Sequence, residues 1–504
     1  MTTQIETSLR LVPLKWEDAQ LVPLAELTER AETATKPEIT VLHTNDFHSS
    51  VTGRPNSHTG EVLGGITRIA TTIKSKKAAG PTLALDAGDS VFGSGTWWDA
   101  QGASTTGRLR GAAGYDLAAI GNHDMEHGLE GLAELFQGGY PFVAANLHFE
   151  ETSFQERVRP AYIAELAGWR VGLTGVTTPD TLHLVPSRML AGMTLTDPTE
   201  SLKTTIKALE PLVDTIIIIS HLGFHGHGTG DLDIAPELAG SKVSVILGGH
   251  THDALTPAPV VNGIILCNAG AFGENMTEIK IAQAGANGLA IRAGLIRQDA
   301  TIDEDGEVLT LRESLAASFQ PLLDLKLALP EVSDLGEDGL SVGYGDWHFS
   351  RDREAVLLAQ ALGQNAEVDP SSLAIVPILY VLGSLPKTAT EMNLAELSEV
   401  YPNIEHLVEV KIGGADLKKL LEFQSSLVFY AQGLPLWVAG QGRVRAGQLE
   451  DEKVYKLITS ELAAEGGLGW KLLPEVVRSS RVLPFTCKEA IREYLETRSL
   501  TGVA

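Results

Sequence analysis

Short apolar runs alternate with helical stretches from residue 39 to about residue 300 of this chain. The runs that predict strands are evenly hydrophobic; they are ITVLHTN, TLALDAG, LAAIGN, PFVAANL, WRVGLTGV, TIIIISH, VSVILGG and GIILCNAG. Stretches such as GGITRIATTIKSKKAAG and DPTESLKTTIKALEPL lie between them and have the length and the glycine or proline ends of helices. Strands without a polar face indicate sheets covered on both sides. The pattern therefore predicts a layered α/β domain over residues 39–300.

The pattern changes outside this region. Residues 1–38 read as an N-terminal extension in which LVPL occurs twice, which is too few copies for a repeat architecture. Residues 301–345 are acidic and rich in turn signals around the helical stretch RESLAASFQPLLDLKLAL, and they predict a linker with a helix. Residues 346–504 again combine helical stretches with strands such as LVEVKIG and KVYKLIT. We predict a second, smaller α/β domain there.

Charge narrows the classes of partner. The chain has 504 residues, too many for one core, in agreement with two domains. Its 64 acidic and 39 basic side chains give a formal net charge of -25, which argues against a nucleic acid polymer or an anionic membrane as the main partner. The same charge would repel an anionic substrate unless metal ions or local arginines reverse the field. The oligomeric state is not determined by the sequence.

Cysteine usage and the N-terminal residues bear on the compartment. The two cysteines, Cys267 and Cys487, are far apart, so a disulfide framework is not expected. The N-terminal residues MTTQIETSLRLVPLKWEDAQ lack the basic region and the continuous apolar run of a secretory signal. The longest apolar run is far shorter than a membrane span. We therefore expect a cytoplasmic protein without a membrane partner.

Candidate metal ligands follow five of the predicted strands. They lie in HTNDFH, DAGDS, GNHD, ISH and GGHTH, and they are Asp46, His48, Asp89, Asn122, His221, His250 and His252. Taken singly, the Asp46–x–His48 pair and Asp89 would more often be turn or helix-cap residues. Open α/β sheets bind ligands beyond the carboxyl ends of their strands, so we expect the whole set to converge. In an extended segment residues i and i+2 share a face, and His250 and His252 would then line one cavity.

The types of donor point to a metal site. Carboxylate, imidazole and amide ligands without thiolate suit Mn, Fe, Zn, Ni or Co. Two ions held about 3.5–4 Å apart usually share a bridging carboxylate. Asp89, at the end of an interior strand, is the candidate bridge. The set predicts a hydrolase with two divalent metal ions.

The same motifs carry a family resemblance. D-x-H, GD, GNHD, a lone histidine after an apolar strand and GH-x-H resemble the calcineurin-like metallophosphoesterases. The longer segments DAGDSVFGS, YDLAAIGNHDMEHG, GLTGVTTPDT and ILGGHTHD resemble the 5'-nucleotidase and 2',3'-cyclic phosphodiesterase branch over roughly residues 40–300. The resemblance implies a four-layer αββα domain followed by a smaller α/β C-terminal domain that recognises substrate.

The resemblance also implies roles for single residues. One metal ion would be held by Asp46, His48 and His252, the other by Asn122, His221 and His250, and Asp89 would bridge them. His123 resembles the catalytic histidine, which would protonate the leaving alkoxide or stabilise charge in the transition state. The carboxylate that orients this ring in the family falls at Glu126 here, and Asp124 is the competing candidate. We favour Glu126.

The family's substrate-reading residues are largely missing from residues 346–504. The place of its NGG-x-x-R loop reads AIVPILYVLGSLPKT, with Lys387 as the nearest cation, and its GGDGY segment has Leu468 and Trp470. Three aromatic residues, Phe429, Tyr430 and Trp437, would either form one face of a base sandwich or, more often, belong to the core. A lysine does not replace the bidentate bonds of an arginine. The sequence therefore predicts the reaction more firmly than a nucleotide substrate.

We predict a dinuclear-metal phosphoester hydrolase in which a metal-bridging hydroxide attacks a phosphomonoester such as a 5'-nucleotide, and His123 assists the leaving group. Three alternatives stay open. The first is a phosphodiesterase, cyclic-nucleotide or sugar-phosphate hydrolase. The others are a SoxB-like sulfur-ester hydrolase and a non-catalytic, metal-dependent binding protein. The expected partner is a small phosphorylated molecule.

Overall fold

The computed structural model describes most of the chain. The described residues are 8–17, 20–28, 36–55, 60–92, 97, 102–225, 229–285, 288–330, 341–344, 347–350, 352–369, 371–374, 389–401, 405–422, 436–438, 442–444, 446–467 and 473–501. They form two compact units: Met1–Phe92, Gln101–Thr181 and Met189–Ala316 make the first, and Gly93–Ala100, Leu182–Arg188 and Ala317–Ala504 make the second. The division falls within helix α9 (Gly306–Leu323), which occupies the predicted linker.

Two sheets form the centre of the first unit. The larger has the order β16-β17-β15-β14-β12-β11-β1-β2 and the smaller the order β10-β8-β7-β6-β3-β18-β19. The larger sheet comprises β1 (Arg10–Glu17), β2 (Gln20–Pro23), β11 (Ala161–Leu166), β12 (Trp169–Thr177), β14 (Thr215–His221), β15 (Val243–Gly248), β16 (Val260–Val261) and β17 (Ile264–Asn268). The smaller comprises β3 (Ile39–Thr44), β6 (Thr82–Asp86), β7 (Leu117–Ala119), β8 (Phe142–Val143), β10 (Val158–Arg159), β18 (Asn275–Ala284) and β19 (Gly288–Arg297). Each predicted strand is confirmed, and PFVAANL divides between β8 and β9 (Leu147–Phe149).

Alternating side chains of the strands build two apolar layers. In β14, Ile217 and Ile219 belong to a core that also contains side chains of the smaller sheet, so this core lies between the sheets. Ile216 and Ile218 belong to a second core with residues of α7 (Pro198–Leu209) and α8 (Asp231–Glu237). Both faces of β14 are therefore buried, which explains a strand without a polar face.

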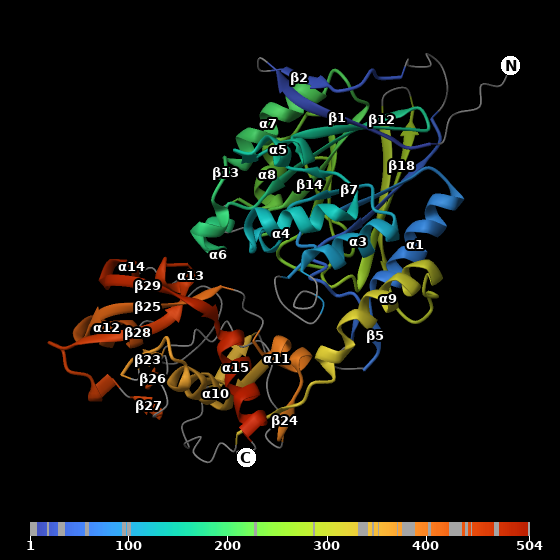
Figure 1. Ribbon diagram of the computed structural model, residues 1–504. Helices are drawn as coiled ribbons and strands as arrows, with labels where there is room; N and C mark the ends of the chain where they lie inside the picture. Colours follow the sequence, from blue (N-terminus) through green and yellow to red (C-terminus); the bar gives the residue numbers. More distant parts are fainter. Residues whose placement is uncertain are drawn as a thin grey trace. The chain divides into compact units, whose positions relative to one another are not determined.

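Helices complete the four layers of this unit. Helices α1 (Ile66–Ala79) and α3 (Ala103–Ala113) contact each other, and α1 packs on β6 of the smaller sheet. Figure 1 shows α7 and α8 on one flank of the two sheets and α1 and α3 on the other. The order helix, sheet, sheet, helix confirms the predicted αββα architecture.

The N-terminal residues form an edge of the larger sheet rather than an appendage. Strand β1 pairs antiparallel with β11, and β2 pairs antiparallel with β1. The two LVPL copies are offset in this hairpin: Leu14 of the first copy lies opposite Pro23 of the second, whereas Val22 lies opposite Lys15. Leu14 is completely buried in the core under α7 and α8. The N-terminal residues therefore serve as two paired strands, a contact that the sequence pattern did not reveal.

The second unit is a smaller α/β domain. Its sheet has the order β27-β26-β23-β28-β25-β29. The strands are β23 (Leu373–Ala374), β25 (His406–Gly413), β26 (Leu436–Val438), β27 (Gly442–Val444), β28 (Val454–Ser460) and β29 (Val477–Thr486). Helices α10 (Asp352–Gln364), α11 (Leu394–Val400) and α15 (Cys487–Thr501) contribute to one core, and α12 (Gly414–Glu422) contributes to another. In the described part of the chain, no helix combines the length and apolar character needed to cross a bilayer.

Candidate metal centre

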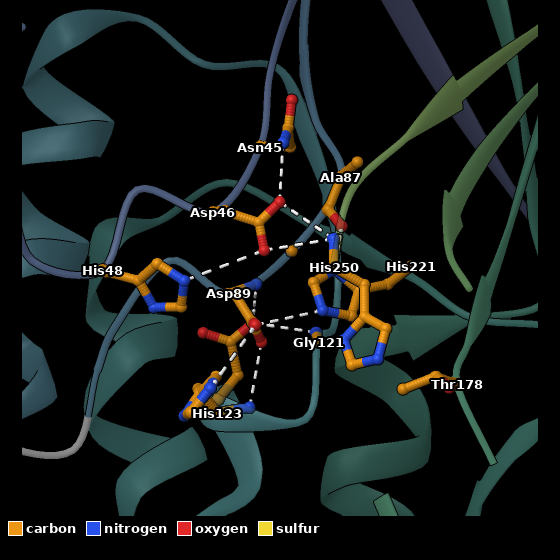
Figure 2. Close-up of polar contacts among 12 residues, drawn as sticks. Asn45, Asp46, His48, Ala87, Asp89, Gly121, His123, Thr178, His221 and His250 are labelled. Atoms are coloured by element: carbon orange, nitrogen blue, oxygen red, sulfur yellow. Dashed lines mark hydrogen bonds and ion pairs between the residues drawn. The ribbon is translucent and has the colours of Figure 1, made fainter. Parts of the chain in front are cut away.

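The carboxyl ends of five strands carry the seven predicted ligands. Asp46 and His48 follow β3, Asp89 follows β6, Asn122 follows β7, His221 ends β14, and His250 and His252 follow β15. Among the described residues, three groups offer ligand atoms within 4.8 Å of one another: Asp46–His48–His252, His48–Asp89–His123 and Asp89–His221–His250. Figure 2 shows Asp89 between Asp46 and His48 on one side and His221 and His250 on the other. The shared members Asp89 and His48 join the groups into one cluster.

Left-handed backbone conformations recur at this cluster. Positive φ angles occur at Asp46 (49°), His48 (47°), Asp89 (52°), His250 (74°) and His252 (58°). Such conformations cost non-glycine residues about 1–3 kcal/mol each and gather at functional sites. The chain thus turns sharply where β3, β6 and β15 end, and the turn aims the side chain into the cluster.

We expected His250 and His252 to share one cavity because residues i and i+2 lie on the same face of an extended segment. The segment does not have that conformation. The segment after β15 is not extended, because both histidines have positive φ. Their rings therefore separate: His250 joins Asp89 and His221, while His252 joins Asp46 and His48. This division matches the two ligand sets that the family resemblance implies, although the local geometry differs from a strand.

Close backbone approach is needed at Gly121. A Cβ atom at this position would lie 2.1 Å from Asp89 Oδ1 and 2.5 Å from the Asp89 backbone nitrogen. No side chain fits in that space. Glycine before Asn122 therefore lets the loop after β7 press against the Asp89 carboxylate, and the His123 backbone N–H donates to Asp89 Oδ1 at 2.9 Å.

The contacts of the two His221 ring nitrogens indicate a cation-binding position beside Nε2. Its Nδ1 lies 2.6 Å from the backbone oxygen of Ala87, so this nitrogen carries a proton and donates. In the neutral ring Nε2 then holds a lone pair, yet it lies 3.1 Å from Asp89 Oδ2. A nitrogen lone pair and a carboxylate oxygen repel each other at this distance unless a proton or a metal ion lies between the two atoms. Burial lowers the pKa of His221, but Asp89 and Asp46 outweigh burial and raise it to about 10.

Other donors of the cluster also fit metal ions. The Asn122 Oδ1 atom is buried and has no hydrogen-bond partner among the described residues. His48 Nε2 and His252 Nε2 lie 2.9 Å apart, and both are near Asp46 Oδ1, at 3.8 and 3.4 Å. Buried polar atoms are normally satisfied, so an orphaned oxygen and facing imidazoles suit a bound cation. The residues present therefore fit two divalent metal ions.

His123 is held by Glu126. Its Nδ1 lies 2.7 Å from Glu126 Oε1, three residues along the same short 3-10 turn, and its Nε2 lies 4.0 Å from Asp89 Oδ2. Burial lowers the pKa of His123, but the charges of Glu126 and Asp89 outweigh it and raise the pKa to about 9. In the metal-free centre these charges favour the protonated ring, which can donate a proton.

Asp124, the competing candidate for the partner of His123, accepts hydrogen bonds from the backbone instead. Its buried carboxylate accepts the backbone N–H groups of Asp89 at 3.0 Å, Val91 at 3.2 Å and Gly121 at 2.9 Å. It ties the loop after β6 to the loop after β7. The structure thus places Glu126 against the His123 ring and uses Asp124 to shape the backbone around Asp89.

A buried ion pair beneath the loops was not anticipated. Arg110 of α3 and Asp86 of β6 are fully buried, with Arg110 Nη2 2.9 Å from Asp86 Oδ1. The other Asp86 oxygen accepts from the Thr44 hydroxyl at 2.6 Å, and Asp86 Oδ1 accepts the Gly88 N–H at 3.1 Å. Asp86 therefore connects the ends of β3 and β6, just before Asp46 and Asp89. Helix α3 carries two arginines, and the sequence alone does not distinguish the buried Arg110 from the exposed Arg108.

Asp180 is a second residue that sequence reasoning missed. Its Oδ2 lies 3.7 Å from His250 Nε2. The signal was present in the segment GLTGVTTPDT, which carried the family resemblance but was assigned no residue role. Asp180 adds negative charge on the side of the cluster where His221 and His250 meet Asp89.

The expectations for substrate-reading residues lie mostly outside the described part of the chain. This holds for Lys387, Phe429, Tyr430, Leu468 and Trp470. Trp437 lies on β26, opposite Arg443 of β27. The structure therefore describes the metal centre in detail and leaves those expectations as predictions.

The fold and the centre define a class of protein. Residues 39–254 match a family model described as calcineurin-like phosphoesterase. This range begins at β3 and ends just after His252, so it includes all five ligand-bearing strand ends. The chain contains a calcineurin-like phosphoesterase domain. Domains of this family bind two divalent metal ions, and the overlapping groups supply candidate ligands for both.

Two curated relatives carry the term 5'-nucleotidase in their names. The chain is 31% identical to 5'-nucleotidase from Bos taurus over 60% of this chain and 52% of that protein. It is 29% identical to a 5'-nucleotidase-related protein from Glossina morsitans morsitans over 43% of this chain and 40% of that protein. The chain thus spans about half the length of these curated relatives or less.

Solved structures share the two-domain fold. The 5'-nucleotidase precursor from Thermus thermophilus has a TM-score of 0.70 at 22% identity and covers 91% of this chain and 96% of its own. The sulfate thiohydrolase SoxB of Thermus thermophilus has a TM-score of 0.61 at 15% identity, covering 94% and 95%. The fold is therefore common to enzymes named for phosphate and for sulfate chemistry.

Proposed function

We propose that this protein is a metal-dependent phosphoester hydrolase that acts on phosphomonoesters, 5'-nucleotides among them. One observation carries the proposal: Asp89 stands between two imidazole-bearing groups, and beside it lies His123, whose Nδ1 is 2.7 Å from Glu126 Oε1. The relatives named as 5'-nucleotidases support the substrate class. A binding protein would have no use for a histidine held in its protonated form by a dedicated carboxylate.

The residues divide the work. Asp46, His48 and His252 would hold one ion, Asn122, His221 and His250 the other, with Asp89 between them. Bound divalent ions supply positive charge for the phosphoryl oxygens and activate water at neutral pH. Mn, Fe, Zn, Ni and Co all suit these donors.

His123 provides the proton of the reaction. Its Nδ1 is engaged by Glu126, so Nε2 is the atom that faces Asp89 and remains to serve the leaving oxygen. A protonated ring at this position donates to a departing alkoxide. Glu126 fixes the orientation of the ring and stabilises its charge.

Hydrolysis assays test the proposal. The full chain is supplied with Mn²⁺ and given p-nitrophenyl phosphate, AMP, a cyclic nucleotide, a sugar phosphate, a diester and a thiosulfonate ester. We expect metal-dependent phosphate release, fastest with a monoester, and its loss in Asp89→Asn. His148→Gln, an exposed histidine outside the cluster, is the control. Absence of phosphate release with every metal, or equal activity of Asp89→Asn, contradicts the proposal.

A further inference from the structure

The amide of Asn45 lies directly behind the candidate ligand Asp46. Asn45 is only 1% exposed, and its side chain forms hydrogen bonds in two directions. Its Oδ1 accepts the Ala269 N–H at 2.9 Å. Its Nδ2 donates to the Gly270 backbone oxygen at 2.5 Å and to Asp46 Oδ2 at 2.6 Å. Both N–H groups and the oxygen of this buried amide are therefore paired.

These contacts allow one orientation of the Asn45 amide. If its oxygen and nitrogen exchanged places, the oxygen would face the Gly270 carbonyl and the Asp46 carboxylate. The nitrogen would then face the Ala269 N–H. All three contacts would be repulsive, because each would join two donors or two acceptors. An N–H of Asn45 therefore points at Asp46.

The two oxygens of the Asp46 carboxylate have different surroundings. Oδ2 accepts from Asn45 and from the His250 backbone N–H, the latter at 2.9 Å, and the same N–H lies 3.1 Å from Oδ1. Oδ1 lies 3.4 Å from His252 Nε2 and 3.8 Å from His48 Nε2. Figure 2 shows one oxygen turned toward Asn45 and the other toward His48. The carboxylate thus presents Oδ1 to the imidazoles of the cluster.

The side-chain contact adds what the backbone contacts of Asp46 do not provide. The Asp46 N–H donates to the Gly88 oxygen at 3.0 Å, and its own oxygen accepts the Phe272 N–H at 2.7 Å. These bonds place the backbone of Asp46. The carboxylate can still turn about its last bond, because that torsion is broad and two-fold. The Asn45 N–H on Oδ2 fixes this rotation.

The rotation of Asp46 decides how many metal ions it can serve. A carboxylate that offers both oxygens can bridge two ions, whereas one with an oxygen held by N–H donors offers a single ligand atom. Among the described residues, Asp89 belongs to two of the candidate ligand groups, and Asp46 belongs only to the group with His48 and His252. The grouping of ligands agrees with the hydrogen bonds on Oδ2.

We propose that Asn45 is a positioning residue that makes Asp46 the ligand of a single metal ion. It holds Oδ2 away from the ions, so Oδ1 serves the ion shared with His48 and His252, and Asp89 is left as the bridge. This inference rests on the proposed function only through its two metal ions and not through its substrate.

The test measures Mn²⁺ binding to the metal-free full chain, with free Mn²⁺ counted by its EPR signal. Asn45→Ala and Asn45→Ser remove the amide, and Asn275→Ala is the matched control. Asn275 is half-buried, and its Nδ2 donates to the Ala269 backbone oxygen at 3.3 Å. The control therefore removes an amide from the same turn while the bond to Asp46 stays in place. Urea unfolding without metal reports the stability of each variant.

The two ions are distinguished by repeating each Asn45 change in Asp46→Ala and in Asn122→Ala. Loss of a residue that orients a ligand typically weakens metal binding 10- to 100-fold. We expect Asn45→Ala to weaken one of the two Mn²⁺ ions by about tenfold or more, and to do the same in Asn122→Ala. In Asp46→Ala no carboxylate is left to orient, so the further change should stay below about twofold.

Three results overturn the inference. They are equal weakening of both ions, an equal loss in the Asp46→Ala and Asn122→Ala backgrounds, and equal Mn²⁺ binding by Asn45→Ala and Asn275→Ala. If Asn45→Ala does not fold, Asn45→Ser is held to the same comparison. Failure of both to fold would show that Asn45 supports the fold, and it would also overturn the inference.

Metal binding and hydrolysis separate this inference from the proposed function. If the wild type hydrolyses no ester but holds one Mn²⁺ more tightly than Asn45→Ala does, the proposed function fails and the inference stands. If the wild type is active and Asn45→Ala binds both ions equally well, the inference fails alone. Wild-type protein that binds no Mn²⁺ contradicts both.

Discussion

Two histidines of the metal centre, His221 and His123, have raised pKa values in the metal-free protein. Burial lowers the pKa of His221 and His123, but neighbouring carboxylates outweigh it and raise their pKa values to about 10 and about 9. The pKa of Asp89 moves the opposite way: burial raises it, and His221 and His123 bring it well below its usual range. The metal-free cluster is thus an array of ion pairs between protonated histidines and the Asp89 carboxylate.

The partner of His123 gives a first prediction. Glu126→Gln removes the charge that raises the pKa of His123, so we expect the alkaline limb of the kcat profile to move to lower pH. The kcat for AMP, whose leaving alkoxide needs a proton, should fall roughly 10- to 100-fold. The kcat for p-nitrophenyl phosphate, whose leaving group is stable as an anion, should fall less. Stopped assays across pH measure both.

Glu130→Gln is the matched control for this prediction. Glu130 lies exposed on α4 (Gly128–Leu135), one turn after Glu126. Its variant should keep the wild-type profile. An unchanged alkaline limb in Glu126→Gln, or an equal loss for both substrates, would show that Glu126 does not govern the proton of His123.

Metal binding gives a second prediction at this scale. With a pKa of about 10, His221 carries a proton at pH 7, and a metal ion that takes Nε2 must displace it. Apparent affinity for Mn²⁺ should therefore rise with pH and fall as the solution becomes more acidic. Calorimetry in buffers of different ionisation enthalpy should detect proton release at pH 7. Binding that is independent of pH and releases no proton would contradict this assignment, and His148→Gln should behave like the wild type.

At the scale of elements, the carboxyl ends of five strands and helix α3 position the candidate ligands. β3, β6 and β7 come from one sheet and β14 and β15 from the other, so the cluster forms where the carboxyl ends of both sheets meet. The Arg110–Asp86 pair joins α3 to two of these ends. Arg110 also places its guanidinium 4.2 Å from the Tyr115 ring and donates to the Tyr140 hydroxyl at 3.2 Å.

The buried pair gives a third prediction. Arg110→Met leaves the Asp86 carboxylate uncompensated in the core, and breaking a buried pair in this way costs about 3–5 kcal/mol of unfolding free energy. Urea denaturation of the metal-free chain measures the change. Asp86→Asn combined with Arg110→Met should recover part of the loss.

Arg108→Met is the control for the buried pair. Arg108 is exposed on the same helix, and its loss should change stability by a few tenths of a kcal/mol. If Arg110→Met unfolds at the same urea concentration as Arg108→Met, the buried pair does not stabilise the domain.

At the scale of the whole molecule, the chain contains two separately built units. The first has a core between its sheets and another under α7 and α8, and the second has its own cores on the two faces of its sheet. All three candidate ligand groups found among the described residues belong to the first unit. Metal ions should therefore act on the stability of one unit.

Calorimetric unfolding tests this separation and gives a fourth prediction. Mn²⁺ at 100 times its Kd should stabilise the first unit by about 2.7 kcal/mol and raise the midpoint of one transition. The transition of the second unit should stay where it is. Asp89→Asn should remove most of the metal-dependent shift. A shift of both transitions, or of neither, would contradict the assignment of the metal centre to the first unit alone.

Much of the fold was predictable because burial leaves a local record. A strand covered on both faces, such as TIIIISH, has apolar residues at consecutive positions, here the four isoleucines, and the candidate ligand His221 ends it. The β1–β2 hairpin was not predictable in the same way. Its Leu14 is buried only because β11 and the helical layer lie against it, and neither neighbour is near in sequence.

The sequence by itself determined the layered fold, the candidate set of ligands and the choice of His123 as the candidate catalytic histidine, because each depends on residue type and order along the chain. Tertiary structure alone decided which histidine joins which group, since left-handed turns at His250 and His252 override strand alternation. It also turned Asp124 toward backbone amides and Glu126 toward His123, and it joined Asn45 to Gly270 across a long stretch of chain. These outcomes depend on contacts between distant segments, whose energies no local pattern records.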